Sequence, residues 1–93
     1  MIRSYKGKKT EMVAAGKTPK GFPTDIVRSA QRKLLMIDNA VELKDLRTPP
    51  GNRLEALKGD RDDQYSIRIN DQFRVCFRWV DGHAEDAEIT DYH

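Results

Sequence analysis

The last three residues of the sequence, Asp91, Tyr92 and His93, are all side chains that can take part in proton transfer. An imidazole titrates near neutral pH, and a neighbouring carboxylate raises its pKa. The alternative is that a histidine at a chain end is only a solvated polar residue. The strand that we expect just before these residues favours an ordered end, and hence a site of general acid or base chemistry. Strand alternation places Asp91 and His93 on one side and Tyr92 on the other.

A second set of candidate residues consists of arginines. Arg68, Arg74 and Arg78 fall on one face of two adjacent predicted strands, and Lys58 ends an adjoining one. Such a donor-rich face would form an exposed groove suited to phosphate oxygens. The alternative is that these arginines pair with acidic residues across the sheet. The acids in question are Asp60, Asp62, Asp63 and Glu55.

The remaining reactive residue types give weaker signals. Cys76 lies in the middle of a predicted strand with no base near it in sequence, so we do not expect a thiol nucleophile. His83 follows a turn and is interpreted as a turn residue. One cysteine and two distant histidines provide neither a disulfide nor a zinc-ligand spacing, so we expect no metal and no cofactor. Apolar runs are too short for a membrane span, and we expect a soluble, cytoplasmic protein.

Helices are predicted in the first half of the chain. A short strand over residues 1–6 and a short helix over 10–15 come first. Thr24 can then cap a longer helix. Its apolar residues recur at helical spacing and predict one buried face: Ile26, Val27, Ala30, Leu34 and Ile37. A second short helix is expected over residues 40–46, ended by two prolines and a glycine.

Strands are predicted in the second half. Period-two alternation and turn residues indicate strands over 53–58, 64–70, 73–80 and about 84–92. Short connections, among them the Asp81-Gly82 pair, indicate antiparallel hairpins. With 93 residues and 38% hydrophobic composition, we expect one domain over residues 1–93. Its predicted class is α+β, with N-terminal helices packed on one face of a small, mostly antiparallel twisted sheet.

Charge is distributed unevenly along the chain. The net charge is +2, but residues 1–34 contain nine Lys/Arg and only two acids. A basic flank of this kind can contact a polyanion through its phosphates, although a solvated charged surface gives the same pattern. The candidate residues for contacting such a polyanion are Lys8, Lys9, Arg28, Arg32, Arg68 and Arg78.

The stretch PPGNRLEALKGDRDDQYSIRINDQFRVCFRW, followed by a hairpin and the terminal EITDYH, resembles the HigB toxins of bacterial toxin–antitoxin systems. These toxins belong to the RelE/ParE superfamily. The blocks LKGDR, SIRIND and RVCFRW and the terminal Asp-Tyr-His occur in order and at matching intervals. The resemblance covers about the last half of the chain closely, and MIRSYK and RKLLMID more loosely.

This resemblance implies a small microbial-ribonuclease-like module that acts as a ribosome-dependent mRNA endoribonuclease. Such a toxin cuts within codons in the ribosomal A site and is inhibited by a helix-turn-helix antitoxin, HigA, through which alone it contacts DNA. The implied active-site positions are Lys58, Arg74, Asp91, Tyr92 and His93. Some members have a histidine three residues before the lysine, where this chain has Glu55, which can act as a base but not as a cation.

The implied chemistry is attack of an RNA 2′-hydroxyl on the adjacent phosphodiester, without a metal. Asp91 or Glu55 would take the proton, and the choice between them stays open. The lysine and arginine would stabilise the phosphorane, the histidine would protonate the leaving oxygen, and the tyrosine would stack on or orient a base. Two other functions stay open: a ParE-like poison of DNA gyrase without nuclease activity, and a small interaction module that acts only within a repressor complex.

Overall fold

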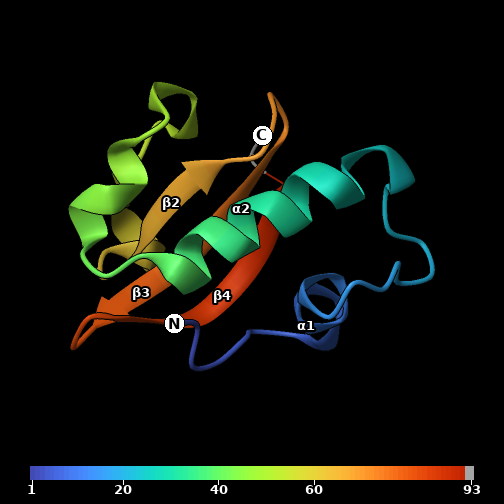
Figure 1. The fold of residues 1–93 in the computed structure, drawn as a ribbon, viewed down its shortest axis with the longest axis horizontal. Helices are drawn as coiled ribbons and strands as arrows, with labels where there is room; N and C mark the ends of the chain where they lie inside the picture. The colour runs from blue at the N-terminus through green and yellow to red at the C-terminus, as the bar shows by residue number, and fades with distance from the viewer. Residues whose placement is uncertain (92–93) are drawn as a thin grey trace.

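The computed structural model describes residues 1–91, which form two helices and a four-stranded sheet (Figure 1). The helices are α1 (Lys8–Ala14) and α2 (Val27–Asn39), and the strands are β1 (Glu55–Ala56), β2 (Tyr65–Arg68), β3 (Phe73–Val80) and β4 (His83–Asp91). Short 3-10 turns connect them: η1 (Thr24–Ile26), η2 (Leu43–Arg47), η3 (Pro50–Asn52) and η4 (Gly59–Arg61). The predicted α+β class is confirmed.

The sheet is an antiparallel meander with the strand order β1-β2-β3-β4. The predicted opening strand is reduced to two isolated parallel bridges on the outer side of β4, Ile2 to Ala84 and Tyr5 to Ala87. The amide of Arg3 donates to the Ala84 carbonyl at 2.8 Å. The first residues therefore cover the β4 edge without forming a regular strand.

Two backbone features shape the hairpin of β3 and β4. Asp81 and Gly82 have φ values of 51° and 79°, which fits a tight turn with two left-handed residues and confirms the predicted hairpin. Asp86 also has a positive φ, 54°, at a register shift between Cys76 and Arg78. This bulge adds one residue to β4, and such an extra residue re-aims the side chains beside it.

The hydrophobic core lies between α2 and one face of the sheet. Ala30, Leu34 and Ile37 of α2 are buried in one cluster with Val75 and Phe77 of β3. Figure 1 shows α2 lying across this face, and the helical spacing predicted for its buried residues is confirmed. The shorter α1 packs beside α2 and β4.

Three local predictions were wrong. No side-chain capping bond is found at the start of η1 or α2, so Thr24 is not a cap; it begins a 3-10 turn that leads into the helix. The helix expected over 40–46 is the 3-10 turn η2. The strand expected over 53–58 is shortened to the two residues of β1. Arg53, before β1, has a left-handed backbone conformation, and the chain turns into η4 at Gly59 after it. No helix among residues 1–91 is long and apolar enough to cross a membrane.

Candidate active site

Arg74 lies near the start of β3 on the sheet face opposite α2, and its side chain is held in place by several oxygens. Its Nε donates to the Ser66 hydroxyl at 2.7 Å, and its Nη2 donates to the Arg53 carbonyl at 2.6 Å. The same Nη2 lies 3.4 Å from a carboxylate oxygen of Glu55. Arg74 is only 8% exposed and Ser66 is fully buried, which corrects the expectation of an exposed arginine. Burial of a guanidinium is tolerated because these oxygens replace its water.

A buried asparagine fixes the loop that supplies one of these oxygens. The Asn52 amide donates to the carbonyls of Leu46 and Thr48 at 3.2 and 3.3 Å, and its side-chain oxygen accepts from Lys33. The next residue, Arg53, adopts the left-handed conformation with a φ of 46°. That conformation is uncommon for a residue with a side chain. The loop therefore delivers the Arg53 carbonyl to Arg74 at a fixed position.

Two of the predicted catalytic residues come from β1 and the residues after it. Register pairs Glu55 with Ser66, which places Glu55 on the same sheet face as Arg74. The Glu55 side chain is 53% exposed, so one partner of the ion pair is in contact with solvent. Lys58 precedes the turn η4 and is exposed; its ammonium makes no hydrogen bond or ion pair with any residue from 1 to 91.

Next to Arg74, the turn η4 covers the middle of this face. Arg61 lies 3.0 Å from Glu88 of β4, and register pairs Glu88 with Cys76. Cys76 is fully buried, and burial raises the pKa of its thiol, with a smaller opposing effect from a hydrogen bond with Thr90. The thiol is therefore kept protonated, which agrees with the expectation that it is not a nucleophile.

Arg78 lies on the same face but is surrounded by acids. Its guanidinium lies 3.0 Å from Asp63, 3.7 Å from Glu85 and 3.6 Å from Asp86. The bulge at Asp86 lets two neighbouring acids of β4 reach one arginine. The alternative considered for the arginines, pairing across the sheet, is therefore what the structure has for Arg78 with Asp63. It holds for Arg74 with Glu55 as well, whereas Arg68 pairs with Asp71 in its own turn.

The end of β4 is the other predicted catalytic region. Register pairs Asp91 with Phe73 and Thr90 with Arg74. Side chains of paired residues point to the same face of the sheet. The Asp91 side chain therefore lies on the face of Phe73, opposite to that of Arg74. One of its oxygens accepts from the Gln72 amide at 3.0 Å. Tyr92 and His93 lie outside the described residues.

The predicted RNA-binding residues occupy two helices and the end of β2. Lys8 and Lys9 are exposed on α1, and Arg28 and Arg32 are exposed on α2. Burial lowers the pKa of Lys33, and the positive charges of Arg32 and Arg68 lower it further. The charges of Arg32 on α2 and Arg68 on β2 therefore both act on Lys33, a link that sequence reasoning did not make.

Sequence reasoning also missed Ser66 and the Arg53 carbonyl as the groups that hold Arg74. The alternation of Ser66 with Tyr65 and Ile67 was a usable signal, since it put a hydroxyl on the arginine face. The Arg53 carbonyl gave no signal in the sequence. Among residues 1–91, no group of three or more His, Cys, Asp or Glu side chains is arranged to hold a metal ion.

Comparison with known proteins identifies the family of this chain. Residues 5–93 match the family described as RelE-like toxin of type II toxin–antitoxin system HigB. The chain belongs to this HigB-like toxin family. Two relatives support the assignment. Toxin HigB-1 of Vibrio cholerae serotype O1 is 48% identical over 63 residues, which are 68% of this chain and 66% of that toxin.

The second relative of this HigB-like chain is Endoribonuclease HigB of Proteus vulgaris, 31% identical over 93 residues and all of both chains. Among solved structures, a chain of the YoeB–YefM complex from Staphylococcus aureus superposes with a TM-score of 0.62. The superposition covers 100% of this chain and 98% of that one at 20% identity, so it supports the fold alone. A ParE-like function is not favoured by these matches.

Proposed function

We propose that this HigB-like toxin is an endoribonuclease that cuts translated mRNA in the ribosomal A site and so inhibits translation. The observation that carries the proposal is the Arg74 guanidinium, fixed by Ser66 and Arg53 and ion-paired with the partly exposed Glu55. A rigid cation beside a solvent-accessible carboxylate is what phosphoryl transfer needs, because charge develops on the phosphate while a proton leaves the nucleophile. The name of the Proteus relative supports the same activity.

In this mechanism the RNA 2′-hydroxyl attacks the adjacent phosphorus and the 5′ oxygen leaves. Arg74 stabilises the negative charge on the phosphorane through guanidinium donors that already have a fixed orientation. Lys58, which has no ionic partner among residues 1–91, adds a second positive charge at the end of β1. His93 protonates the leaving oxygen and Tyr92 stacks on a base, in keeping with the resemblance described above. The products are a cyclic phosphate and a free 5′-hydroxyl, and the reaction uses no metal.

The geometry favours Glu55 over Asp91 as the general base. Glu55 shares a sheet face with Arg74, whereas register directs Asp91 to the face of Phe73. A base must lie within hydrogen-bonding reach of the proton that it removes, in the place where the phosphate is bound. Asp91 is then the alternative base.

The partners follow from the same proposal. Ribosomal RNA and mRNA are contacted by the exposed cations of α1 and α2, and by Arg68. The partner that silences the toxin is an antitoxin, as the family description implies, and we propose a HigA-type helix-turn-helix protein. The toxin acts in the cytoplasm, where translating ribosomes are found.

The test is to map 5′ ends on a defined mRNA after adding the purified protein, with and without translating ribosomes. We expect cuts inside codons only when ribosomes translate the message. We expect the cuts to disappear both with Arg74→Ala and when Tyr92 and His93 are removed. Glu55→Gln should abolish cleavage more completely than Asp91→Asn if Glu55 is the base. No cuts in either sample would refute the nuclease proposal.

Ribosome binding is tested separately from cleavage. The variant Arg28→Glu/Arg32→Glu should bind ribosomes less tightly, with a weaker salt dependence, because phosphate contacts release counterions. The exposed double variant Lys17→Glu/Lys20→Glu, outside the helices, changes the net charge by the same amount and is the matched control. Unchanged binding by the double variant, with intact folding by circular dichroism, would remove α2 from the proposed ribosome-binding surface.

A further inference from the structure

The strand β1 has an outer edge that no described strand covers. Within residues 1–91, β1 is terminal in the sheet order and pairs only with β2. Leu57 donates its amide to the Gln64 carbonyl at 2.8 Å, so it faces β2. Backbone groups alternate along an antiparallel strand, and the N–H and C=O of Ala56 therefore point away from the sheet. An open edge of this kind is a template for another strand.

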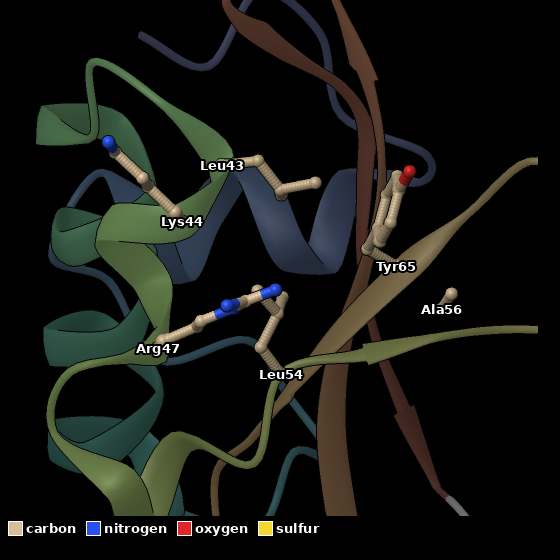
Figure 2. A pocket seen from close by; sticks show the side chains of 6 residues that line it. All are labelled: Leu43, Lys44, Arg47, Leu54, Ala56 and Tyr65. Carbon is tan, nitrogen blue, oxygen red and sulfur yellow. The ribbon is translucent and has the colours of Figure 1, made fainter.

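A pocket lies directly beside this edge. It has a volume of about 380 Å³ and is formed by η2, β1, β2 and the residue before β1. Leu43, Leu54, Ala56 and Tyr65 give it apolar walls (Figure 2). In Figure 2 the side chain of Leu43 points toward Tyr65 across the pocket. The space is large enough for an apolar side chain of a docked strand, which recognises its site through alternate side chains.

The pocket also has a positive charge at its rim. Arg47 extends from η2 over Leu54 toward the strands, whereas the Lys44 amine points away from them (Figure 2). Lys44 lies 3.5 Å from Glu42, but Arg47 makes no ion pair or hydrogen bond within residues 1–91. A cation next to an apolar pocket is complementary to a ligand that carries both an apolar side chain and a carboxylate.

We propose that the β1 edge and this pocket are the docking site of the antitoxin, which supplies an extended acidic segment. The segment pairs with the backbone of Ala56, places an apolar side chain between Leu43 and Tyr65, and places a carboxylate beside Arg47. The inference rests on the proposed function, because it explains how that site is silenced. Its occupant is the antitoxin of the same system, a partner that the family description implies.

The site is suited to inhibition because β1 connects it to the proposed active site. Neighbouring residues of a strand point to opposite faces, so Glu55 points to Arg74 while Ala56 lines the pocket. Lys58 follows two residues later. A strand paired with β1 runs along both residues and excludes a substrate phosphate from the edge where Glu55 is exposed. Binding at one face of β1 thereby blocks chemistry at the other.

The experiment measures the affinity of the full-length toxin for the purified antitoxin of its own system by isothermal titration calorimetry. Ala56→Pro removes an outward donor without removing a β1–β2 bond, and should weaken binding about tenfold or more. Arg47→Glu should weaken it about tenfold or more as well, because it replaces an attraction by a repulsion. Lys44→Glu, on the same turn but with an amine that points away from the strands, is the matched control and should change affinity less than about threefold.

Each variant is also assayed for mRNA cleavage without antitoxin and for its thermal unfolding. Retained cleavage and folding with weaker inhibition support the docking site. Unchanged affinity of Arg47→Glu, or equal losses for Arg47→Glu and Lys44→Glu, would overturn it. Sedimentation of the toxin alone tests a second copy as the occupant: a dimer abolished by Ala56→Pro, with antitoxin affinity unchanged, would also overturn the proposal. If the unaltered toxin cleaves no mRNA, the proposed function fails while the binding result stands.

Discussion

Arg74 and Arg78 leave the same face of β3, four residues apart, but their surroundings differ. Arg74 is buried against a hydroxyl and a backbone carbonyl, and it forms an ion pair with the partly exposed Glu55. Arg78 is about two-fifths exposed and has three carboxylates around it. Neutral oxygens hold a guanidinium without cancelling its charge, whereas three acids more than neutralise it. The comparison teaches that neutral oxygens position Arg74 within the described residues, whereas ion pairs let Arg78 tie β3 to β4 and to Asp63.

The largest effect should come from replacing Arg74. We expect Arg74→Lys to reduce mRNA cleavage about 10²- to 10³-fold, because a single ammonium cannot keep the Ser66, Arg53 and Glu55 contacts and also stabilise the phosphorane. Single-turnover cleavage with saturating ribosomes measures this loss. The matched change Arg78→Lys should reduce cleavage less than about threefold. Equal losses in the two variants would break the proposed distinction.

The next effect concerns the hydroxyl that positions Arg74. Ser66→Ala removes the acceptor of the Arg74 Nε and should lower kcat about 10- to 100-fold with little change in KM, because a misplaced cation is felt mainly in the transition state. Ser66→Thr keeps the hydroxyl and should restore most of the activity. Steady-state cleavage kinetics give the split between kcat and KM. A loss of stability with kcat unchanged would show that Ser66 is only structural.

A smaller effect, on stability, should follow from replacing Arg78. Arg78→Gln leaves Asp63, Glu85 and Asp86 near one another without a cation. Because this site is partly solvent-screened, we expect the free energy of unfolding to fall by only about 0.5–1 kcal/mol. Urea unfolding at low and high salt measures it, and the deficit should shrink in high salt. A deficit that persists unchanged in high salt would argue against repulsion among the acids.

The smallest effect involves Cys76, which lies between the two arginines. Burial raises the pKa of its thiol in the folded protein above the unfolded value. As pH rises, the unfolded chain therefore loses the thiol proton before the folded protein does. The contribution of this group to the free energy of unfolding is fully present below the unfolded pKa and is lost as pH rises through the folded pKa. The unaltered protein should lose more stability than Cys76→Ala between pH 7.5 and about pH 10. Parallel pH profiles of the two would exclude a thiol contribution.

Much of the fold could be predicted because it depends on local patterns. The alternation of Phe73, Val75 and Phe77 predicted β3, and the Asp81-Gly82 pair predicted the hairpin after it. Elements without a strong period were misjudged. The segments over 40–46 and 53–58 carry apolar residues at spacings that fit more than one type of secondary structure. Contacts with the rest of the fold determine that they form a 3-10 turn and a two-residue strand.

The sequence by itself determined the residue types of the candidate site and the sheet face on which the arginines of β3 lie, since period-two alternation depends only on chain geometry. Only the tertiary structure decided which groups surround each of these arginines. The Arg53 carbonyl that holds Arg74 is 21 residues away in sequence, and its direction depends on a left-handed backbone conformation and on the buried Asn52. The acids around Arg78 meet because a bulge shifts the register of β4. Contacts of this kind arise when distant segments pack together, and no local pattern of residues encodes them.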